Sequence, residues 1–374
     1  MDKRLDNKPV IAIDAMGGDA GPETIVSAVR LALKRAPDIH LILVGDQTRI
    51  QQALQANKLA NHTQITVRHT TEVILSDDSP ASVLRNKKDS SMRVAIELVA
   101  GGEADACVSA GNTGALMGLA RYVLKMLPGI DRPAICTTVP NKFGRIHWLD
   151  LGANVDSSAE QLLQFAVMGS ALCTVVDGID RPEVALLNIG SEAIKGNEQV
   201  KKAAELIQAS PLNYIGFAEG NDIYNGKVDV IACDGFVGNV ALKTSEGLAH
   251  LIGDLLKENF TRNLLTRLAA IISLPVLRRV TGKIDPGKYN GASLLGLNGI
   301  VIKSHGSADA QSFANAIRIA ELEVQKQLPS RIRELLANYQ QSIEAVVAQK
   351  AEAEASQAVE QTATLSPSSG FTNK

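Results

Sequence analysis

Aromatic side chains are scarce in this 374-residue sequence, where Phe, Trp and Tyr make up 3% while hydrophobic residues as a whole make up 45%. The core must therefore be built from Val, Ile, Leu and Ala, which is typical of soluble α/β proteins. The four cysteines are dispersed, mostly in or beside apolar runs, and form no CxxC pair. We interpret them as reduced core residues of a cytoplasmic protein.

An excess of positive charge is also missing, because the formal net charge is −2. This argues against general nucleic-acid binding. The first nine residues, MDKRLDNKP, contain charges but no apolar signal core, and no uncharged run approaches the length of a membrane span. We therefore expect a cytoplasmic protein that meets a membrane only peripherally.

The motifs of several large enzyme classes are absent. The six histidines are scattered without HExxH, and neither GxSxG, a Walker phosphate loop nor a GxGxxG after a strand is present. We expect no metal and no cofactor. What remains is an inventory of glycine-rich turns, Asn, Ser and one well-placed lysine, Lys195. Such groups suit the binding of an anion and the stabilisation of developing negative charge without a covalent protein nucleophile.

The most informative stretch is Lys227–Gly247, KVDVIACDGFVGNVALKTSEG. Its apolar run predicts a buried strand at Val228–Cys233, followed by a glycine-bracketed turn and the start of a helix. This geometry directs backbone N–H groups and the positive end of a helix dipole toward an anion. Asn239 lies where the turn becomes the helix, where its amide could donate to a ligand or cap the helix.

The same arrangement recurs along the chain. Ala106–Leu119 contains Asn112 after a strand, and Trp148–Leu162 contains Asn154. A further strand ends at Gly190 and runs into Ser191 and Lys195. We expect these turns to form one crevice at the carboxyl edge of a parallel sheet, where ligands usually bind in such folds.

Helices and strands alternate through the sequence, which predicts a three-layer α/β/α fold with a mostly parallel, Rossmann-like sheet. We predict one catalytic domain over residues 9–344. Strands are expected at Pro9–Asp14, His40–Val44, Gln64–His69, Ala134–Val139, Ile146–Leu151, Glu183–Ile189, Tyr214–Ala218 and Gly299–Lys303.

Residues 259–284 differ from their surroundings because they contain five basic residues and no acidic one, together with many leucines and isoleucines. We predict two short helices in a protruding amphipathic hairpin, interrupted at Pro275, that lies on an anionic membrane surface. The alternatives are a dimer interface or a buried helical arm. Residues 345–374 are rich in Ala, Glu, Gln and Ser without an apolar face, which predicts a disordered tail.

Six separated blocks, in order, closely resemble the bacterial acyl-ACP:phosphate acyltransferases of phospholipid synthesis. They are IAIDAMGGDAGP, SAGNTGALM, LDLGANV, LLNIGSEAIKG, DGFVGNVALK and YNGASLLGLNGIVIKSHGSA, spread over about residues 9–325. One departure is Ser191, where members of the family often carry an acid.

The resemblance implies an enzyme that converts a long-chain acyl-ACP and inorganic phosphate into acyl phosphate and free ACP, on a fold like that of the isocitrate and isopropylmalate dehydrogenases. It points to Lys195 and Asn239 as catalytic residues, which agrees with an ammonium group that attracts phosphate and an amide that stabilises an oxyanion. His305 could protonate the leaving sulfur or serve as a structural hydrogen bonder. The residues expected to line the crevice or bind phosphate are Gly17, Gly18, Asn112, Thr113, Asn154, Gly190, Gly238, Ser304, His305, Gly306 and Ser307.

The resemblance also implies a homodimer at the cytoplasmic membrane that passes its product to a membrane glycerol-3-phosphate acyltransferase. ACP is acidic and needs a basic landing site, but the sequence does not separate contacts with ACP from contacts with anionic lipid. The residues expected to make one or the other are Arg262, Leu264, Arg267, Leu268, Ile271, Ile272, Leu277, Arg278 and Arg279.

Three other functions fit parts of the sequence. A phosphate acetyltransferase that uses acetyl-CoA has similar demands for anion binding. An isocitrate-type dehydrogenase needs a metal-binding set of aspartates and a nicotinamide site, and neither cluster is found. A membrane-recruited scaffold of lipid synthesis would keep the basic hairpin and tolerate the loss of Lys195 and Asn239.

Overall fold

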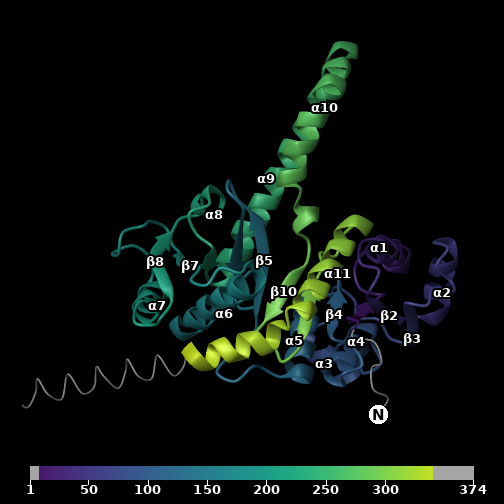
Figure 1. Cartoon of the computed structure of the whole chain (residues 1–374), viewed down its shortest axis with the longest axis horizontal. Helices are drawn as coiled ribbons and strands as arrows, with labels where there is room; N and C mark the ends of the chain where they lie inside the picture. Colours follow the sequence, from purple (N-terminus) through teal and green to yellow (C-terminus); the bar gives the residue numbers. More distant parts are fainter. Residues whose placement is uncertain (1–7, 340–374) are drawn as a thin grey trace, which may run out of the picture.

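An 11-stranded sheet runs through the molecule, with helices on both of its faces (Figure 1). The computed structural model describes residues 8–339, so the predicted tail and the last residues of the predicted domain lie outside the described residues. The three-layer α/β/α architecture predicted from the sequence is confirmed. The strand order across the sheet is β3-β2-β1-β4-β11-β10-β5-β6-β9-β7-β8.

The strands are short and rich in Val, Ile, Leu and Ala. Their bounds are β1 Val10–Asp14, β2 His40–Gly45, β3 Ile65–His69, β4 Ala106–Ser109, β5 Ala134–Pro140, β6 Arg145–Leu149, β7 Glu183–Leu187, β8 Asn213–Ala218, β9 Val230–Ala232, β10 Ala292–Leu295 and β11 Ile300–Lys303. Every strand predicted above is present within one or two residues of its expected bounds. The strand that the sequence analysis missed is β10, a four-residue antiparallel strand among glycines.

The helices connect these strands and cover both faces of the sheet. Their bounds are α1 Gly21–Arg35, α2 Gln47–Ala56, α3 Pro80–Asn86, α4 Ser91–Ala100, α5 Thr113–Leu124, α6 Ala159–Asp177, α7 Glu198–Gln208, α8 Asp222–Asn225, α9 Gly235–Thr261, α10 Leu264–Ile284 and α11 Ala310–Gln325. A short 3-10 helix, η1, spans Pro286–Tyr289.

Three hydrophobic clusters hold the layers together. One packs α1, α2 and α11 on β1, β2 and β11, and another packs α6 and α7 on β6, β7 and β9. The third lies across the opposite face of both halves and contains the fully buried Trp148. By length and composition α6 could cross a membrane, which was not expected from the sequence, but 61% of its apolar window is buried. Since α6 packs in this core, its apolar length is explained by burial.

The two halves of the sheet run in opposite directions. β10 is antiparallel to both β11 and β5, and β5 is antiparallel to β6, while the remaining pairs are parallel. The predicted single carboxyl edge is therefore wrong as a description of the whole sheet. Only strands within one half share an edge.

The strand register nevertheless brings the carboxyl ends of both halves together. Across the sheet, one row of paired residues contains Val108, Ile302, Ser293, Cys136, Leu149 and Ala232. The strands β4, β11, β6 and β9 all end within one residue of this row. Because the halves are offset along the strand direction, turns from both of them meet near the centre of the sheet.

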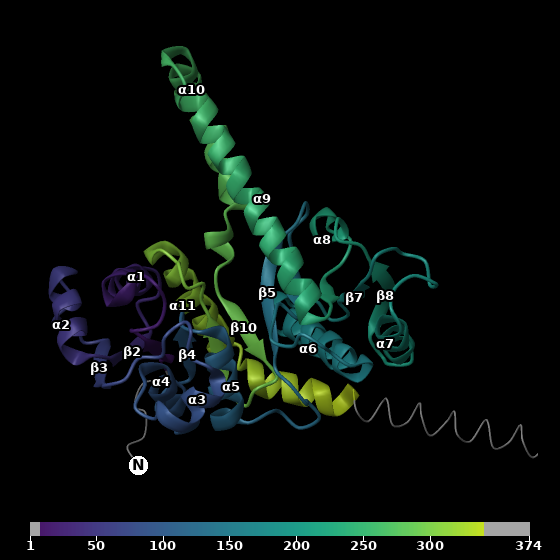
Figure 2. The same cartoon turned by 180° about the vertical axis from the view of Figure 1, so that it is seen from behind.

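The predicted hairpin is present but larger than expected. α9 and α10 form two long antiparallel helices that project from the body, joined at Arg262 and Asn263 (Figures 1 and 2). α10 continues through Pro275 instead of ending there. The hairpin was predicted to start at residue 259, but its first arm begins at Gly235, shortly after β9.

Candidate functional site

A pocket of about 1200 Å³ lies where the two halves of the sheet meet. One wall is the first half of α9, and the opposite walls are β5, η1 and the loop after β11. It is lined by polar residues at one end and by apolar side chains of α9 and β5 along its length. The apolar residues include Ile135, Val139, Leu151, Leu242, Leu248 and Ile252.

The buried carboxylate of Asp150 organises the floor in the second half of the sheet. It accepts hydrogen bonds from the backbone N–H groups of Ile135 (2.9 Å), Ala153 (3.1 Å) and Asn154 (2.7 Å). Burial raises the pKa of Asp150, although these hydrogen bonds act in the opposite direction. The carboxylate therefore fixes the LDLGANV turn as a rigid loop under α9.

Glycines let this loop approach the first turn of α9. A Cβ at Gly238 would lie 2.0 Å from the carbonyl oxygen of Asp150, and one at Gly235 would lie 2.2 Å from that of Asn154. Asp234 caps the helix by accepting from the backbone of Phe236 at 2.9 Å. The DGFVG sequence thus places the start of α9 directly on the loop after β6.

Asn239 is the fifth residue of α9, and its side chain lines the pocket. A Cβ at Gly152 would lie 3.4–3.5 Å from the Asn239 side chain, so this glycine forms the surface on which the amide rests. The helix is capped by Asp234 rather than by Asn239. The capping alternative for Asn239 is therefore removed, and its amide is placed to donate into the pocket.

A second buried carboxylate, Asp14, organises the turns in the first half. It accepts from the hydroxyl groups of Ser91 and Ser109, both at 2.6 Å. Burial raises the pKa of Asp14, against the effect of these hydroxyl groups. A Cβ at Gly17 would lie 2.4 Å from the Asp14 carboxylate, so Gly17 shapes this support beneath the pocket.

Gly18 allows the turns after β4 and β11 to pack against the turn after β1. Its φ of +89° favours glycine, and a Cβ there would lie 2.9 Å from both the Ala110 side chain and the Gly306 carbonyl oxygen. The backbone N–H of Asp19 donates to the same carbonyl at 2.9 Å. The turns after β1, β4 and β11 are therefore locked together.

His305 connects the loop after β11 with α9. Its Nε2 lies 3.2 Å from the ammonium of Lys243, and its Nδ1 lies 2.9 Å from the hydroxyl of Ser307. Burial and the neighbouring Lys243 lower the pKa of His305. Since an ammonium only donates, Nε2 accepts from Lys243, and the backbone N–H of Ser307 donates to Nδ1 at 3.3 Å.

Lys303, the last residue of β11, extends into the same end of the pocket. Its ammonium donates to the carbonyl oxygens of Ser304 and, at 3.4 Å, Ala110. Burial and the proximity of Lys243 lower the pKa of Lys303 to about 8, whereas Asp14 and Asp19 act in the opposite direction. This end of the pocket therefore holds two nearby cationic side chains.

The structure brings many of the predicted crevice residues together. Those that line the pocket are Thr113, Asn239, Ser304, His305, Gly306 and Ser307. Gly17, Gly18 and Gly238 lie beneath it and support its walls, as described above. Ser304 is fully buried, and its hydroxyl accepts from Asn290 at 2.8 Å, so it contributes to the wall chiefly as a support.

Two predicted crevice amides are instead occupied within the protein. The Asn112 side chain caps α5 and donates to the carbonyl oxygens of Ser76 and Asp78 at 2.9 and 3.1 Å. The buried Asn154 side chain donates to Pro133 and Asp150, both at 2.9 Å. Their predicted role in lining the crevice is corrected here to one of positioning loops, because no amide hydrogen is directed at the pocket.

Lys195 does not line the pocket in this structure. It lies in the exposed loop between β7 and α7, where Asn188 donates to its backbone carbonyl at 3.2 Å. Gly190, in the same loop, is buried, and a Cβ there would lie 3.1 Å from the Lys195 side chain. β7 is the neighbour of β9, so this loop begins at the same edge of the sheet as α9.

Lys243 was not predicted from the sequence as a functional residue. Lys303 was named only as the last residue of the predicted strand Gly299–Lys303. On an amphipathic helix a lysine usually indicates the solvent side, so Lys243 gave no distinctive signal. The available signal was its position four residues after Asn239, on the same helical face.

A separate buried cluster combines three types of metal ligand. The ligand atoms of His147, Cys173 and Asp177 lie within 4.8 Å of one another. His147 Nε2 lies 2.7 Å from Asp177, and Arg145 forms an ion pair with the same carboxylate. These contacts join β6 to the end of α6 as a structural ion-pair network.

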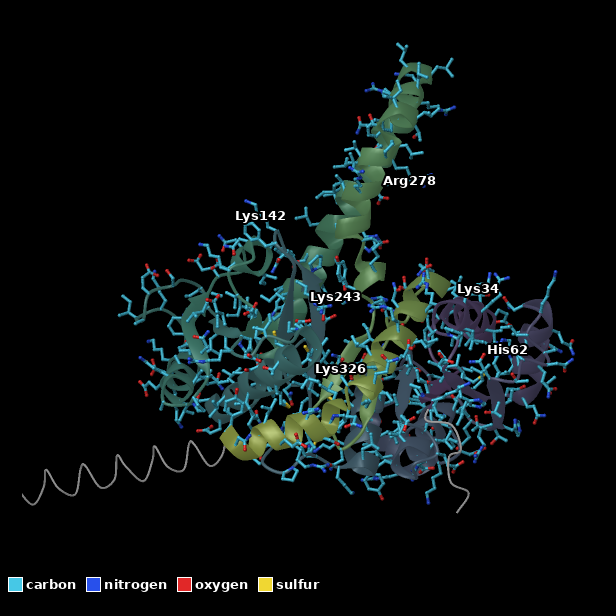
Figure 3. All side chains as sticks on the ribbon, viewed as in Figure 1. Lys34, His62, Lys142, Lys243, Arg278 and Lys326 are labelled. Atoms are coloured by element: carbon cyan, nitrogen blue, oxygen red, sulfur yellow. The ribbon has the colours of Figure 1, made fainter. Side chains whose placement is uncertain are left out.

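Most of the predicted contact residues lie on the outer half of the hairpin, whereas Leu277, Arg278 and Arg279 lie nearer the body, on the second half of α10. Figure 3 shows Arg278 on the projecting arm, apart from Lys243. Leu264, Leu268, Ile271 and Ile272 are between 57% and 82% exposed. Arg262, Arg267, Arg278 and Arg279 are exposed as well, and Leu277 is half-buried. The hairpin therefore presents apolar and basic side chains together.

Comparison with known proteins places this geometry in a family. The sequence profile of the family described as "Fatty acid synthesis protein" matches residues 10–331. A phosphate acyltransferase of Alkalilimnicola ehrlichii is 58% identical over 326 residues, covering 87% of this chain and 95% of that protein. One from Methylococcus capsulatus is 57% identical over 328 residues, covering 88% and 97%.

Solved structures with a similar fold are much more distant in sequence. A phosphotransacetylase from Streptococcus pyogenes has a TM-score of 0.58 at 18% identity, covering 86% of this chain and 95% of that one. One from Staphylococcus aureus has a TM-score of 0.54 at 18% identity, covering 87% and 96%. At this identity the likeness concerns the fold alone.

Proposed function

The chain belongs to the fatty acid synthesis protein family, with relatives that are phosphate acyltransferases, and we propose that this acyltransferase uses long-chain acyl-ACP as its acyl donor. The products are acyl phosphate and free ACP, and the acyl phosphate feeds glycerolipid synthesis. Inorganic phosphate attacks the thioester directly, without an acyl-enzyme.

The observation that carries this proposal is the shape and chemistry of the pocket. Its polar end holds Asn239, Lys243 and Lys303, while its wall on α9 becomes apolar toward Ile252. From Asn239 to Ile252 the helix rises by roughly 20 Å at 1.5 Å per residue. An anion at the polar end and an extended long acyl chain along α9 would both be accommodated.

The reaction needs little proton transfer from the protein. Phosphate is partly a dianion at neutral pH, and the thiolate of ACP is a good leaving group. The main barriers are the approach of an anion to a carbonyl and the charge that develops on its oxygen. Asn239 donates to that oxygen, and the cations around the pocket attract the phosphate.

Lys195 is the second catalytic candidate. Its side chain is exposed beside the edge of the sheet at which α9 begins. Its participation requires the loop between β7 and α7 to move toward Asn239 when substrate binds. Loop closure of this kind is common in enzymes that exclude water from the reacting groups.

The hairpin supports a peripheral membrane location. Its outer half combines exposed Leu264, Leu268 and Ile272 with the basic Arg262 and Arg267, which is the composition of a segment that binds an anionic bilayer. Nearer the body, Leu248 and Leu251 of α9 are 57% and 53% exposed. This inner stretch supports pairing with the same helix of a second copy in a homodimer.

A location at the cytoplasmic face of the membrane fits the chemistry of both substrate and product. Acyl-ACP is delivered from the cytoplasm, and the basic residues of the hairpin also suit the acidic surface of ACP. Acyl phosphate is a reactive lipid that would pass to a membrane glycerol-3-phosphate acyltransferase.

A phosphate acetyltransferase that uses acetyl-CoA is the second candidate, supported by the fold shared with phosphotransacetylases. The test is to incubate purified protein and phosphate with either palmitoyl-ACP or acetyl-CoA and to measure free thiol. We expect thiol release from palmitoyl-ACP. Release from acetyl-CoA alone would favour the second candidate.

A further inference from the structure

We propose that Lys243 and Lys303 together form the subsite that holds inorganic phosphate, each contributed by one half of the sheet. Lys303 ends β11 in the first half, while Lys243 lies on α9, which follows β9 in the second half. This assignment rests on the proposed function, because it specifies how one of the two substrates is bound.

Lys303 is a cation without a carboxylate partner among the residues that the structure describes. Among the described residues, those within hydrogen-bonding distance of its ammonium are the carbonyl oxygens of Ala110 and Ser304, and the carboxylates of Asp14 and Asp19 act on it from farther away. A half-buried ammonium whose close partners are carbonyl oxygens is poorly compensated for its lost hydration. An anion that enters the pocket would supply the missing countercharge.

Lys243 approaches the same position from the other wall. Its ammonium contacts Glu246 at 2.7 Å and His305 at 3.2 Å. Because the imidazole accepts from this ammonium, it orients Lys243 toward the loop that begins at Lys303. Two neighbouring ammonium groups repel each other, and this repulsion is relieved when a dianion binds between them.

The acidic residues that line the pocket do not compete for this position. Glu246 is paired with Lys243. Asp285 accepts from the backbone of Gly287 at 2.9 Å, and Asp309 caps α11 by accepting from the backbone of Ser312 at 2.8 Å. Each of these carboxylates therefore has a local donor, and the cationic end stays accessible to a dissolved anion.

A third lysine of the pocket, Lys142, serves as a matched control for Lys243 and Lys303. Lys142 also lines the pocket, but next to Tyr224, and its ammonium lies 5.3 Å from the centre of the Phe143 ring. Figure 3 shows Lys142 and Lys243 at separate positions, on the β5–β6 turn and on α9. If only general positive charge mattered, loss of Lys142 would have the same effect as loss of Lys243.

The test measures steady-state kinetics of Lys243→Met, Lys303→Met and Lys142→Met with both substrates varied. Removal of one charge-assisted contact is worth about 10-fold to 100-fold in affinity. We expect the KM for phosphate to rise by about this factor in the first two variants, with the KM for acyl-ACP within about 2-fold of wild type. Lys142→Met should leave the KM for phosphate within about 2-fold of wild type, and Lys243→Arg and Lys303→Arg should recover part of the loss.

Calorimetric titration of inorganic phosphate into the protein, without acyl donor, separates this inference from the proposed function. Weaker phosphate binding by Lys243→Met and Lys303→Met, in variants with wild-type melting temperatures, would support the subsite even if wild type had no activity on acyl-ACP. Unchanged phosphate affinity in both variants, or an equal loss in Lys142→Met, would overturn it. Absence of turnover by wild type with intact phosphate binding would count against the proposed function only.

Discussion

The ammonium of Lys243 lies 3.2 Å from Nε2 of His305, although the two residues are 62 positions apart in the sequence. The contact joins α9, which follows a strand of the second half of the sheet, to the loop that follows β11 in the first half. The position of α9 therefore determines whether Asn239 and the turns of the first half face the same pocket.

Substitution of Asn239 by Ala tests the oxyanion role. We expect kcat to fall on the order of 100-fold or more, which is typical for loss of one oxyanion donor, while the melting temperature stays near wild type. The exposed side chain of Asn239 is not needed for the helix cap, which Asp234 supplies.

Lys195→Ala, measured in parallel, is expected to slow turnover, and a normal rate in either variant would remove that residue from the mechanism.

The pH dependence of phosphate use follows from Lys303. Its pKa is lowered to about 8, so its ammonium is charged below this pH and becomes neutral as the pH rises through it. The dianion fraction of phosphate still rises between neutral pH and about pH 8, which opposes the effect there, but the second ionisation is nearly complete above about pH 8. We therefore expect the KM for phosphate to rise between about pH 8 and 9, as measured by initial rates.

The variant Lys303→Arg provides the control for this prediction. A guanidinium keeps its charge across this range, so the rise in KM should disappear. An identical pH profile in wild type and Lys303→Arg would show that another group is responsible.

Two glycines of α9 provide a matched pair for the packing at its start. A Cβ at Gly238 would lie 2.0 Å from the Asp150 carbonyl oxygen, whereas one at Gly247 would have no atom within 4 Å. We expect Gly238→Ala to lower the melting temperature and the activity together, because the helix must shift away from the loop. Gly247→Ala should be stabilising by up to about 1 kcal/mol through helix propensity. Equal melting temperatures would contradict this account of the packing.

The membrane prediction concerns the outer half of the hairpin. We expect the double variant Leu268→Glu/Ile272→Glu to lose binding to vesicles that contain anionic lipid, measured by co-sedimentation, because both side chains are exposed and apolar. The control is Leu251→Glu on the inner stretch, which should keep vesicle binding and instead weaken dimerisation in sedimentation velocity. Vesicle binding that survives the double variant would assign the outer half to another interface.

The sequence predicted the layers and most of the strands because their patterns are local. Apolar runs such as Val228–Cys233 end in glycine turns, and both signals lie within a few residues of each other. The opposed halves could not be predicted in this way, because the direction of β6 depends on its pairing with β5 through a short turn at residues 141–144. β10 was missed because four residues between glycines carry little periodicity.

The functional residues that lie in turns between a strand and a helix could be predicted from the sequence. Asn239 and the loop of His305 were found from their place between a strand and a helix. Asn112 and Asn154 have the same local context, but their amides bind carbonyl groups of Asp78 and Pro133, which no local pattern reveals. Whether an Asn after a strand contacts a bound ligand or holds a loop in place depends on hydrogen-bond partners that are distant in the sequence.

The most direct test of the account is a rapid-quench measurement of thiol release from palmitoyl-ACP, with and without phosphate. If phosphate attacks the thioester directly, no ACP thiol should be released when phosphate is absent. When phosphate is added, thiol release should begin without a burst. A burst of thiol equal to the enzyme concentration without phosphate, accompanied by a palmitoyl mass increment on the protein, would show an acyl-enzyme and contradict the mechanism.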